Sequence, residues 1–555
     1  MTMKTIKLII IAIVCISAAS CNDKVLDVTP TDQLTDASVF STPENAGLFL
    51  NDIYNSLNPG PWSSVFTLLP TEISNDPLDN YSDNSVSGPL AGIPSYQSFA
   101  NGSYGATVPM FDKQWQNMYA NIRKCNLFIT KVTPATFDAT IKKSYIAQAR
   151  FLRSYYYKSL IDMYGGVPLI LKALDQATDG DAIFYPRSTY DECVTFIEKE
   201  CEDIQADLPL TVSGNNIGRA TKGAALALEG EEELYAGKWQ NAAATNLKIM
   251  NLGAGYDLFS DYAGIFYSAN DDNKEVIFDI QYAPIIKGTS RDSYWGPVQV
   301  TDGTGYGAVN PTQDLVDAYE FLDGKTEAEG SAMFDSANPY NNRDKRFAAS
   351  IIYDGCTWRN GVIYTRAGIP NNRNAFDPSG AGGSTRSGYF LRKLLDPAIV
   401  PGSANIGTHT GGANVIIWRY AEVLLNYAEA KNEASGPDQT IYDALNKVRA
   451  RGGLPNLPGG LSQDALRQRI RRERRIEMAF EGKRLFDLWR WRIADQVFSK
   501  PLMAMKITGT GSALTYQKVN IGGGQIIFKP AKNYLMPIPQ TVIAQNPKIT
   551  QNQGY

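Results

Sequence analysis

Two stretches of the chain combine aromatic rings with acids, amides and arginine, and both have the composition of loops. Sugar rings present apolar C–H faces that can stack on tyrosine and tryptophan, whereas sugar hydroxyl groups need polar partners. Residues 75–104 and 282–310 are therefore candidate carbohydrate-binding stretches. Their candidate ligand-binding residues are Asp76, Asn80, Tyr81, Tyr96, Arg291, Tyr294, Trp295 and Tyr306.

Trp295 is the first choice among these candidates. It lies in the short polar segment DSYWG, residues 292–296, which we predict to lie outside the core. The alternative for every aromatic residue in these stretches is that its ring packs inward and anchors its own loop. No motif selects between the two roles for a single residue.

Catalytic and metal-binding patterns are not recognisable. The single histidine, His409, excludes a zinc site with two histidines and argues against a Ser–His–Asp triad. Glu473 and Glu477 share a helix face, but arginine-rich surroundings predict that both stay ionised, which does not suit a general acid. Residues 271–273 lack the spacing of a calcium loop and are interpreted as a turn. We expect no metal, cofactor or catalysis, with a helical glycoside hydrolase as an alternative.

The stretch from Ile470 to Trp491 positions the two glutamates. At helical spacing one stripe contains Leu466, Ile470, Glu473, Glu477, Phe480, Arg484, Leu488 and Trp491. Carboxylates on such an apolar stripe are costly unless cations meet them. We predict one continuous helix with at least one glutamate buried and paired with an arginine, Arg419 being the first choice. A solvated helix with i,i+4 Glu–Arg pairs is the alternative.

The first 21 residues resemble a bacterial lipoprotein leader. Lys4 and Lys7 precede a short apolar run, and small residues at positions 18–20 precede Cys21. This pattern predicts a signal peptide over residues 1–20, lipidation of Cys21 and a lipid-anchored tether over residues 21–36. The apolar run is too short to span a bilayer, so we expect membrane contact through the lipid. An ordinary signal peptide followed by a chance cysteine is the alternative.

The overall composition is that of a globular protein. The chain has 555 residues, of which 43% are hydrophobic and 20% charged. The formal net charge of −4 becomes about −6 without Lys4 and Lys7, which argues against a nucleic-acid partner. Cys193 and Cys201 lie eight positions apart in a predicted helix, too far for a disulfide, and no CxxC pair indicates zinc.

Helical periodicity dominates the chain. Predicted helices run from residue 43 to 57, 115 to 128, 140 to 163, 190 to 208, 221 to 236 and 239 to 250, with helix pairs recurring near 415–450 and 463–492. Residues 275–280 alternate like a strand, 348–353 form a second candidate strand, and 500–535 are interpreted as irregular. The predicted fold class is mainly α, with tetratricopeptide-like helix pairs forming a scaffold, long irregular loops and a few short strands. We divide it into parts 37–254 and 255–555, which form one compact superstructure.

Five segments, in order, resemble the SusD/RagB family of outer-membrane nutrient-binding lipoproteins. They are ARFLRSYYYKSLIDMYGGVPLI (149–170), WRYAEVLLNYAEAKNEA (418–434), LNKVRARGGLP (445–455), IRRERRIEMAFEGKRLFDLWRW (470–491) and YLMPIPQTVIAQNPKITQNQGY (534–555). The resemblance implies a lipoprotein of the outer membrane, facing the exterior, that binds an oligo- or polysaccharide. It also implies a partner, a TonB-dependent SusC-like transporter that receives the ligand. Loops from broadly the two aromatic stretches would bind the ligand, and the RagB branch leaves a peptide as an alternative ligand.

Overall fold

The computed structural model describes residues 39–57, 77–88, 99–284, 286–289, 291–300, 303–399, 411–511, 513–522 and 526–555. The predicted signal peptide, Cys21 and the tether lie outside these ranges. Asp76, Tyr96 and His409 also lie outside them.

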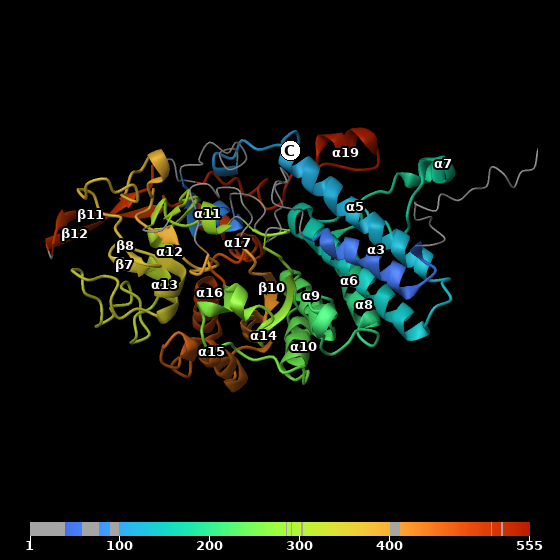
Figure 1. The fold of residues 1–555 in the computed structure, drawn as a ribbon, viewed down its shortest axis with the longest axis horizontal. Coiled ribbons are helices and arrows are strands. Elements are labelled where there is room, and N and C mark those ends of the chain that lie inside the picture. Colours follow the sequence, from blue (N-terminus) through green and yellow to red (C-terminus); the bar gives the residue numbers. More distant parts are fainter. Residues whose placement is uncertain are drawn as a thin grey trace, which may run out of the picture.

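Packed helices make up one end and the centre of the molecule (Figure 1). At one end lie α3 (Pro43–Asn55), α5 (Pro109–Val132), α6 (Ala139–Tyr164) and α8 (Tyr190–Ile204). The centre contains α9 (Lys222–Tyr235), α10 (Trp239–Met250), α14 (Tyr420–Ser435), α15 (Gln439–Arg451) and α16 (Gln463–Glu477). Short helices complete the set: α7 (Gln176–Asp179), α11 (Arg291–Tyr294), α12 (Gln313–Ala318), α13 (Lys345–Ser350), α17 (Arg484–Arg490), α18 (Ala494–Phe498) and α19 (Gln540–Gln545). The prediction of a mainly α fold with helix pairs is confirmed.

Local sequence explains the ends of the long helices. The Asp138 carboxylate accepts the backbone N–H groups of Thr140 and Ile141 at 2.9 Å and caps the start of α6. Gly165, at φ +71°, ends the same helix in a left-handed conformation that favours glycine. Thr189 and Glu192 form a reciprocal capping box at the start of α8.

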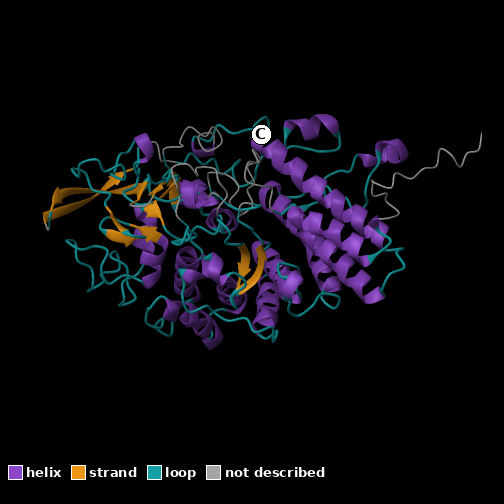
Figure 2. Ribbon diagram, viewed as in Figure 1, coloured by secondary structure: helices purple, strands orange, loops and turns teal. Residues whose placement is uncertain are grey.

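The strands form six two-stranded antiparallel pairs within the described residues, most of them at the end opposite α3 (Figure 2). The pairs are β1 (Ser85–Ser87) with β5 (Val309–Pro311), β2 (Val276–Ile280) with β10 (Val415–Arg419), β3 (Gln299–Val300) with β4 (Gly303–Thr304), β6 (Ile351–Ile352) with β9 (Phe390–Leu391), β7 (Cys356–Trp358) with β8 (Gly361–Ile363), and β11 (Met503–Thr510) with β12 (Ala513–Asn520).

Three predicted boundaries are wrong. The first half of the stretch 348–353 is the end of α13, and only Ile351–Ile352 form β6. The supposedly irregular stretch 500–535 contains the β11–β12 hairpin; β12 has no buried residue, so no apolar face marks it as a strand in the sequence. The helix pair predicted near 415–450 begins later than expected, because β10 pairs with β2 as far as Arg419 and α14 begins at Tyr420.

The predicted continuous helix over residues 470–491 is two helices. α16 ends at Glu477 and α17 begins at Arg484. Between them Phe480 and Gly482 adopt positive φ angles of 66° and 73°. The buried carboxylate of Asp79 accepts the backbone N–H groups of Phe480 at 2.9 Å and Gly482 at 3.1 Å, and so stabilises the turn. A positive φ is costly for phenylalanine, so this turn depends on tertiary contacts.

Two large hydrophobic clusters form the core. The larger one joins α3, α5, α6, α8 and α9 to the β2–β10 pair, and the second lies in the strand-rich part. The cysteines of the described part, Cys125, Cys193, Cys201 and Cys356, are buried free thiols.

Candidate functional site

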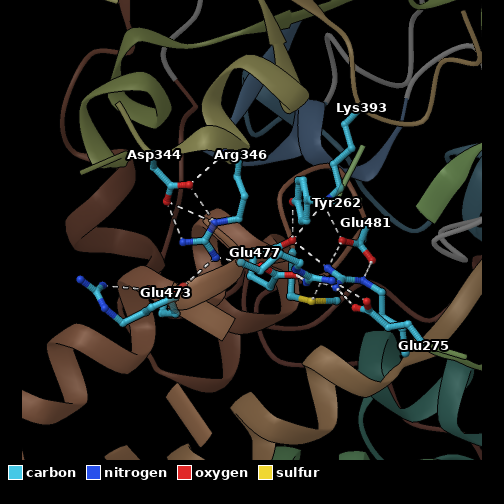
Figure 3. Close-up of polar contacts among 12 residues, drawn as sticks. Tyr262, Glu275, Asp344, Arg346, Lys393, Glu473, Glu477 and Glu481 are labelled. Carbon is cyan, nitrogen blue, oxygen red and sulfur yellow. Dashed lines mark hydrogen bonds and ion pairs between the residues drawn. The ribbon is translucent and has the colours of Figure 1, made fainter. Parts of the chain in front are cut away.

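A buried ionic cluster joins Arg419 of β10 and Arg451 of α15 to Glu477 of α16. Figure 3 shows Glu477 among the other acidic side chains of the cluster, Glu275, Glu473 and Glu481. The Arg419 guanidinium donates to Glu477 at 2.6 Å, to Glu275 at 2.8 Å and to Glu481 at 2.5 and 2.7 Å. All four side chains are almost fully shielded from solvent. Arg419, the predicted partner, therefore contacts Glu477 from the last position of β10.

Further cations surround the two glutamates of α16. Arg346 contacts Glu473 at 2.6 Å and Glu477 at 2.8 Å, and it is held by Asp344 at 2.7 Å. Arg449 contacts Glu473 at 3.1 Å, and Arg451 contacts Glu477. The sequence reasoning missed Arg346, because its partner Glu477 lies 131 positions away and no local pattern links the two.

The backbone end of α16 is also satisfied in this cluster. The Glu477 carbonyl accepts hydrogen bonds from Arg419 at 2.8 Å, Lys393 at 2.9 Å and the Tyr262 hydroxyl at 2.9 Å. Burial by itself raises the pKa of the Glu477 carboxyl, but the guanidiniums of Arg451, Arg419 and Arg346 outweigh burial and hold it well below its usual range. A carboxylate kept ionised in this way anchors structure and does not act as a general acid.

Tyr294 and Tyr306 form a stacked pair at the surface of the second aromatic stretch. Their ring centroids lie 4.9 Å apart, the ring planes are inclined by 17°, and both side chains are half-buried. Backbone bonds fix the two segments: Tyr306 N–H donates to Ser293 O at 3.0 Å, and Ala308 N–H donates to Tyr294 O at 2.9 Å. A half-exposed aromatic pair held by its backbone offers a preformed apolar surface to the C–H face of a ligand such as a sugar ring.

Close backbone packing explains two glycines beside Tyr306. A Cβ atom on Gly305 would lie 2.4 Å from the Pro297 carbonyl oxygen. Gly307, at φ +63°, would place a Cβ atom 2.7 Å from the Gly383 carbonyl oxygen. Tyr306 therefore lies between two positions where only glycine fits without a shift of the backbone.

The first aromatic stretch joins the second through the backbone of residues 307–311. The Asn80 amide donates to Ala308 O at 3.3 Å, and its carbonyl oxygen accepts from the Ser85 hydroxyl at 2.7 Å. Gly88 N–H also donates to Ala308 O, at 2.9 Å, where the β1–β5 pair ends. Two stretches about 200 residues apart thus support the Tyr294–Tyr306 pair together.

Four of the predicted ligand residues are buried. Trp295 is only 3% exposed and packs in the second hydrophobic cluster, so the expectation that it lies outside the core is wrong. Tyr81 is fully buried and packs edge-on against Phe99 at 4.8 Å. Asn80 and Arg291 are buried as well, and Arg291 donates to the Ala413 carbonyl at 3.1 Å. These four side chains support the loops and leave the exposed surface to Tyr294 and Tyr306.

The single turn of α11 explains why Trp295 is buried while the neighbouring Tyr294 remains at the surface. α11 runs from Arg291 to Tyr294 and directs Asp292 and Ser293 inward, where Asp292 accepts the Asp396 N–H at 2.8 Å. Burial raises the pKa of the Asp292 carboxyl to about 7. Apart from Tyr294, the polar segment 292–296 is therefore buried and not exposed, because its polar groups form hydrogen bonds inside the fold.

Metal-binding clusters and membrane-spanning helices are both absent from the described ranges. No group of three or more acidic, cysteine or histidine side chains is arranged to hold a metal ion in this part of the chain. No helix among the described residues combines the length and apolar character that crossing a bilayer requires.

Comparisons with known proteins place the chain among relatives of one kind. Residues 274–555 match the model of the SusD family, and residues 29–229 match a model described as "starch-binding associating with outer membrane". SusD-like protein P2 of Formosa agariphila is 27% identical, and the alignment covers all of both chains. The starch-binding protein SusD of Bacteroides thetaiotaomicron is 26% identical over 33% of this chain and 32% of its own length.

Solved structures agree with this grouping. A SusD-like protein of Bacteroides fragilis is 29% identical with a TM-score of 0.78, covering 95% of this chain and 100% of that chain. A SusD-like carbohydrate-binding protein of the same species is 25% identical with a TM-score of 0.80, covering 92% and 100%. Because the family model matches half of the chain and the fold matches over nearly its whole length, this chain belongs to the SusD family.

Proposed function

We propose that this chain binds an oligo- or polysaccharide through the stacked rings of Tyr294 and Tyr306. The observation that carries the proposal is this half-exposed pair, which backbone hydrogen bonds hold in place. Relatives with carbohydrate- and starch-binding names support the choice of a sugar as the ligand. Stacking on each ring is worth about 0.5–1.5 kcal/mol, so a site built on one pair should bind in the millimolar to micromolar range.

Removing the rings should weaken binding while the fold persists. Tyr294→Ala and Tyr306→Ala are each expected to weaken retention by the preferred polysaccharide about fivefold, because each loses about 1 kcal/mol of stacking. The double variant should lose more. Affinity electrophoresis on a polysaccharide panel measures the effect, and thermal unfolding checks the fold.

Tyr364→Ala is the matched control. Tyr364 is also half-buried and lies under the Arg366 guanidinium, but it lies outside the Tyr294–Tyr306 pair. If the control weakens binding as much as the two test variants, the pair is not the site. Binding of peptides in place of glycans would identify a RagB-like ligand, and release of reducing ends from the polysaccharide would identify a hydrolase.

We further propose that lipid on Cys21 holds the protein at the outer membrane, facing the exterior, where it delivers glycan to a TonB-dependent SusC-like transporter. The leader pattern before Cys21 and the outer-membrane description of the matching family model support this placement. The transporter is inferred from family membership alone. If the protein closes over the transporter as a lid, the transporter adds a second binding surface for the ligand. This second surface would raise the effective concentration of a weakly bound ligand.

Cys21→Ala should release the protein from membranes. Without the thiol no acyl chain can be attached, so the variant should move from the detergent phase to the aqueous phase with unchanged thermal unfolding. Cys125→Ala, which removes a buried thiol of the body, is the control and should stay in the detergent phase. Wholly unchanged partitioning of the Cys21 variant would exclude lipidation at this residue.

A further inference from the structure

Three cavities open around the loop of residues 209–219, and none is lined by the Tyr294–Tyr306 pair. Their volumes are about 750, 300 and 240 Å³. Arg219 lines all three. Cavities of this size accommodate one or more sugar units, so the chemistry of their walls becomes the question.

Arg219 is held in place by neutral groups. Its guanidinium donates to the Gln148 side-chain oxygen at 3.1 Å and to the Asn51 side-chain oxygen at 2.5 Å. It also lies over the Tyr54 ring at 5.6 Å, and the Tyr54 hydroxyl donates to the same Gln148 oxygen at 3.0 Å. Gln148 is buried, so the hydrogen-bond acceptor that holds the guanidinium is itself fixed in the fold.

The charge of Arg219 is not neutralised by the surrounding protein. No carboxylate of the described residues forms an ion pair with it. The two amides use two of its five N–H groups. An arginine fixed by neutral partners keeps both its charge and its remaining donors available to an anion.

A second cation, Lys287, lines the cavity of about 300 Å³ together with Arg219. Its ammonium donates to the Asn55 carbonyl oxygen at 2.8 Å and to the Asn55 side chain. It is half-buried, and within the described part of the chain it forms no ion pair with a carboxylate. Burial lowers its pKa to about 8, which leaves it largely charged at neutral pH.

Among the described residues that line this cavity, two cations face one carboxylate. A further carboxylate, Asp272, lines the neighbouring cavity of about 240 Å³ and accepts from Gln281 at 3.3 Å. Asp279, the acidic residue of the lining, already accepts from Gln281 at 2.8 Å and Asn414 at 2.9 Å, and burial raises its pKa to about 7. Asp52 acts on Lys287 from α3, but it is paired with Lys124 at 2.7 Å. The carboxyl-terminal end of α3 attracts cations, but a helix end carries only about half a negative charge. The capping of α3 therefore explains part of the position of Lys287, and the described lining of this cavity still contains one more cation than carboxylate.

We propose that this cavity binds the carboxylate or sulfate group of an acidic oligosaccharide. Arg219 and Lys287 contact the anion. The Asn215 amide, the Asn51 NH₂ group and the Gln281 side-chain oxygen also belong to the lining and can contact hydroxyl groups. The choice of a sugar rests on the proposed function, whereas the preference for an anion rests on Arg219 and Lys287. The site is separate from the aromatic pair and would select acidic glycans.

Calorimetric titration of the whole mature protein tests the proposal with matched probes. The probes are a pentagalacturonate, its methyl ester, a sulfated oligosaccharide and inorganic sulfate. The acid, the sulfated sugar or both should bind about tenfold more tightly than the ester, and that binding should weaken between about 0.05 M and about 0.5 M salt. Arg219→Gln and Lys287→Gln should each remove most of the difference between charged and neutral probes.

Arg492→Gln is the control, because Arg492 also lies over a tyrosine ring, Tyr534 at 4.5 Å, but outside this cavity. Equal affinity for charged and neutral sugars, or unchanged binding in both cavity variants, overturns the proposal. Binding of inorganic sulfate without either charged sugar also overturns it. Loss of the charged sugars in Tyr294→Ala would place them at the aromatic pair and has the same consequence.

The two proposals can fail separately. If no polysaccharide is retained by the Tyr294–Tyr306 pair but the charged probes bind in an Arg219-dependent manner, only the proposed function at the aromatic pair fails. If neutral polysaccharide binds through the pair and the charged probes gain nothing from Arg219, only the anion site fails.

Discussion

Glu477→Ala is expected to lower the free energy of unfolding by about 3–5 kcal/mol. The substitution leaves three buried guanidiniums, those of Arg346, Arg419 and Arg451, each without one carboxylate partner. Breaking one member of a buried ionic cluster costs more than replacing the whole cluster, because the remaining charges stay buried. Denaturant unfolding at neutral pH measures the loss.

Asp464→Ala on the same helix is the control. The Asp464 side chain is 85% exposed and pairs with Arg467, so its loss should leave the unfolding midpoint nearly unchanged. Because the pKa of Glu477 is held below its unfolded value, its contribution is complete above the unfolded pKa and is lost as the pH falls toward the folded pKa. Wild type and Glu477→Ala should therefore converge in acid. A loss at neutral pH no larger than that of Asp464→Ala would contradict the structural role of the cluster.

Asp79→Ala should destabilise the protein by about 3 kcal/mol or more. The buried Asp79 carboxylate accepts hydrogen bonds from Phe480 N–H, Gly482 N–H and the Asn84 amide. Each donor left without a partner in the interior costs about 1–3 kcal/mol, and the positive φ of Phe480 adds strain that these bonds offset. Denaturant unfolding gives the change in stability.

Two comparisons sharpen this test. Asp438 also accepts two backbone N–H groups, those of Thr440 and Ile441, but at an exposed helix start, so Asp438→Ala should cost only about 1 kcal/mol. Asp79→Asn keeps one acceptor oxygen and should lose less than Asp79→Ala. Burial raises the pKa of Asp79, which also favours a neutral replacement. Equal losses in Asp79→Ala and Asp438→Ala would mean that the turn does not depend on the buried carboxylate.

Local patterns predicted most of the helical scaffold. Apolar residues at helical spacing act within a few residues, so the sequence predicted a helix over residues 140–163, within one residue of each end of α6. The same reasoning predicted that the glutamates of α16 need cations, because an apolar stripe with carboxylates is costly in any fold. The order of the five family-like segments along the chain indicated the family by itself.

Contacts between segments far apart in the sequence determined the features that local patterns did not predict. The helix breaks after Glu477 because Asp79, about 400 positions earlier, binds the backbone of the turn. Tyr294 faces the surface and Trp295 the core because residues 305–308 pair with the segment that carries both. The partners of the Arg219 guanidinium are the neutral side chains of Gln148 and Asn51, which come from distant helices, and no described carboxylate forms an ion pair with it.

The sequence by itself therefore determined which segments are helices, which charges need partners and which family the chain resembles. Only the tertiary structure decided which aromatic rings remain at the surface, where the long helix ends and where positive charge is left over. The physical reason is range: helical periodicity and capping act over three or four residues, whereas burial and ion pairing join side chains that can lie hundreds of residues apart.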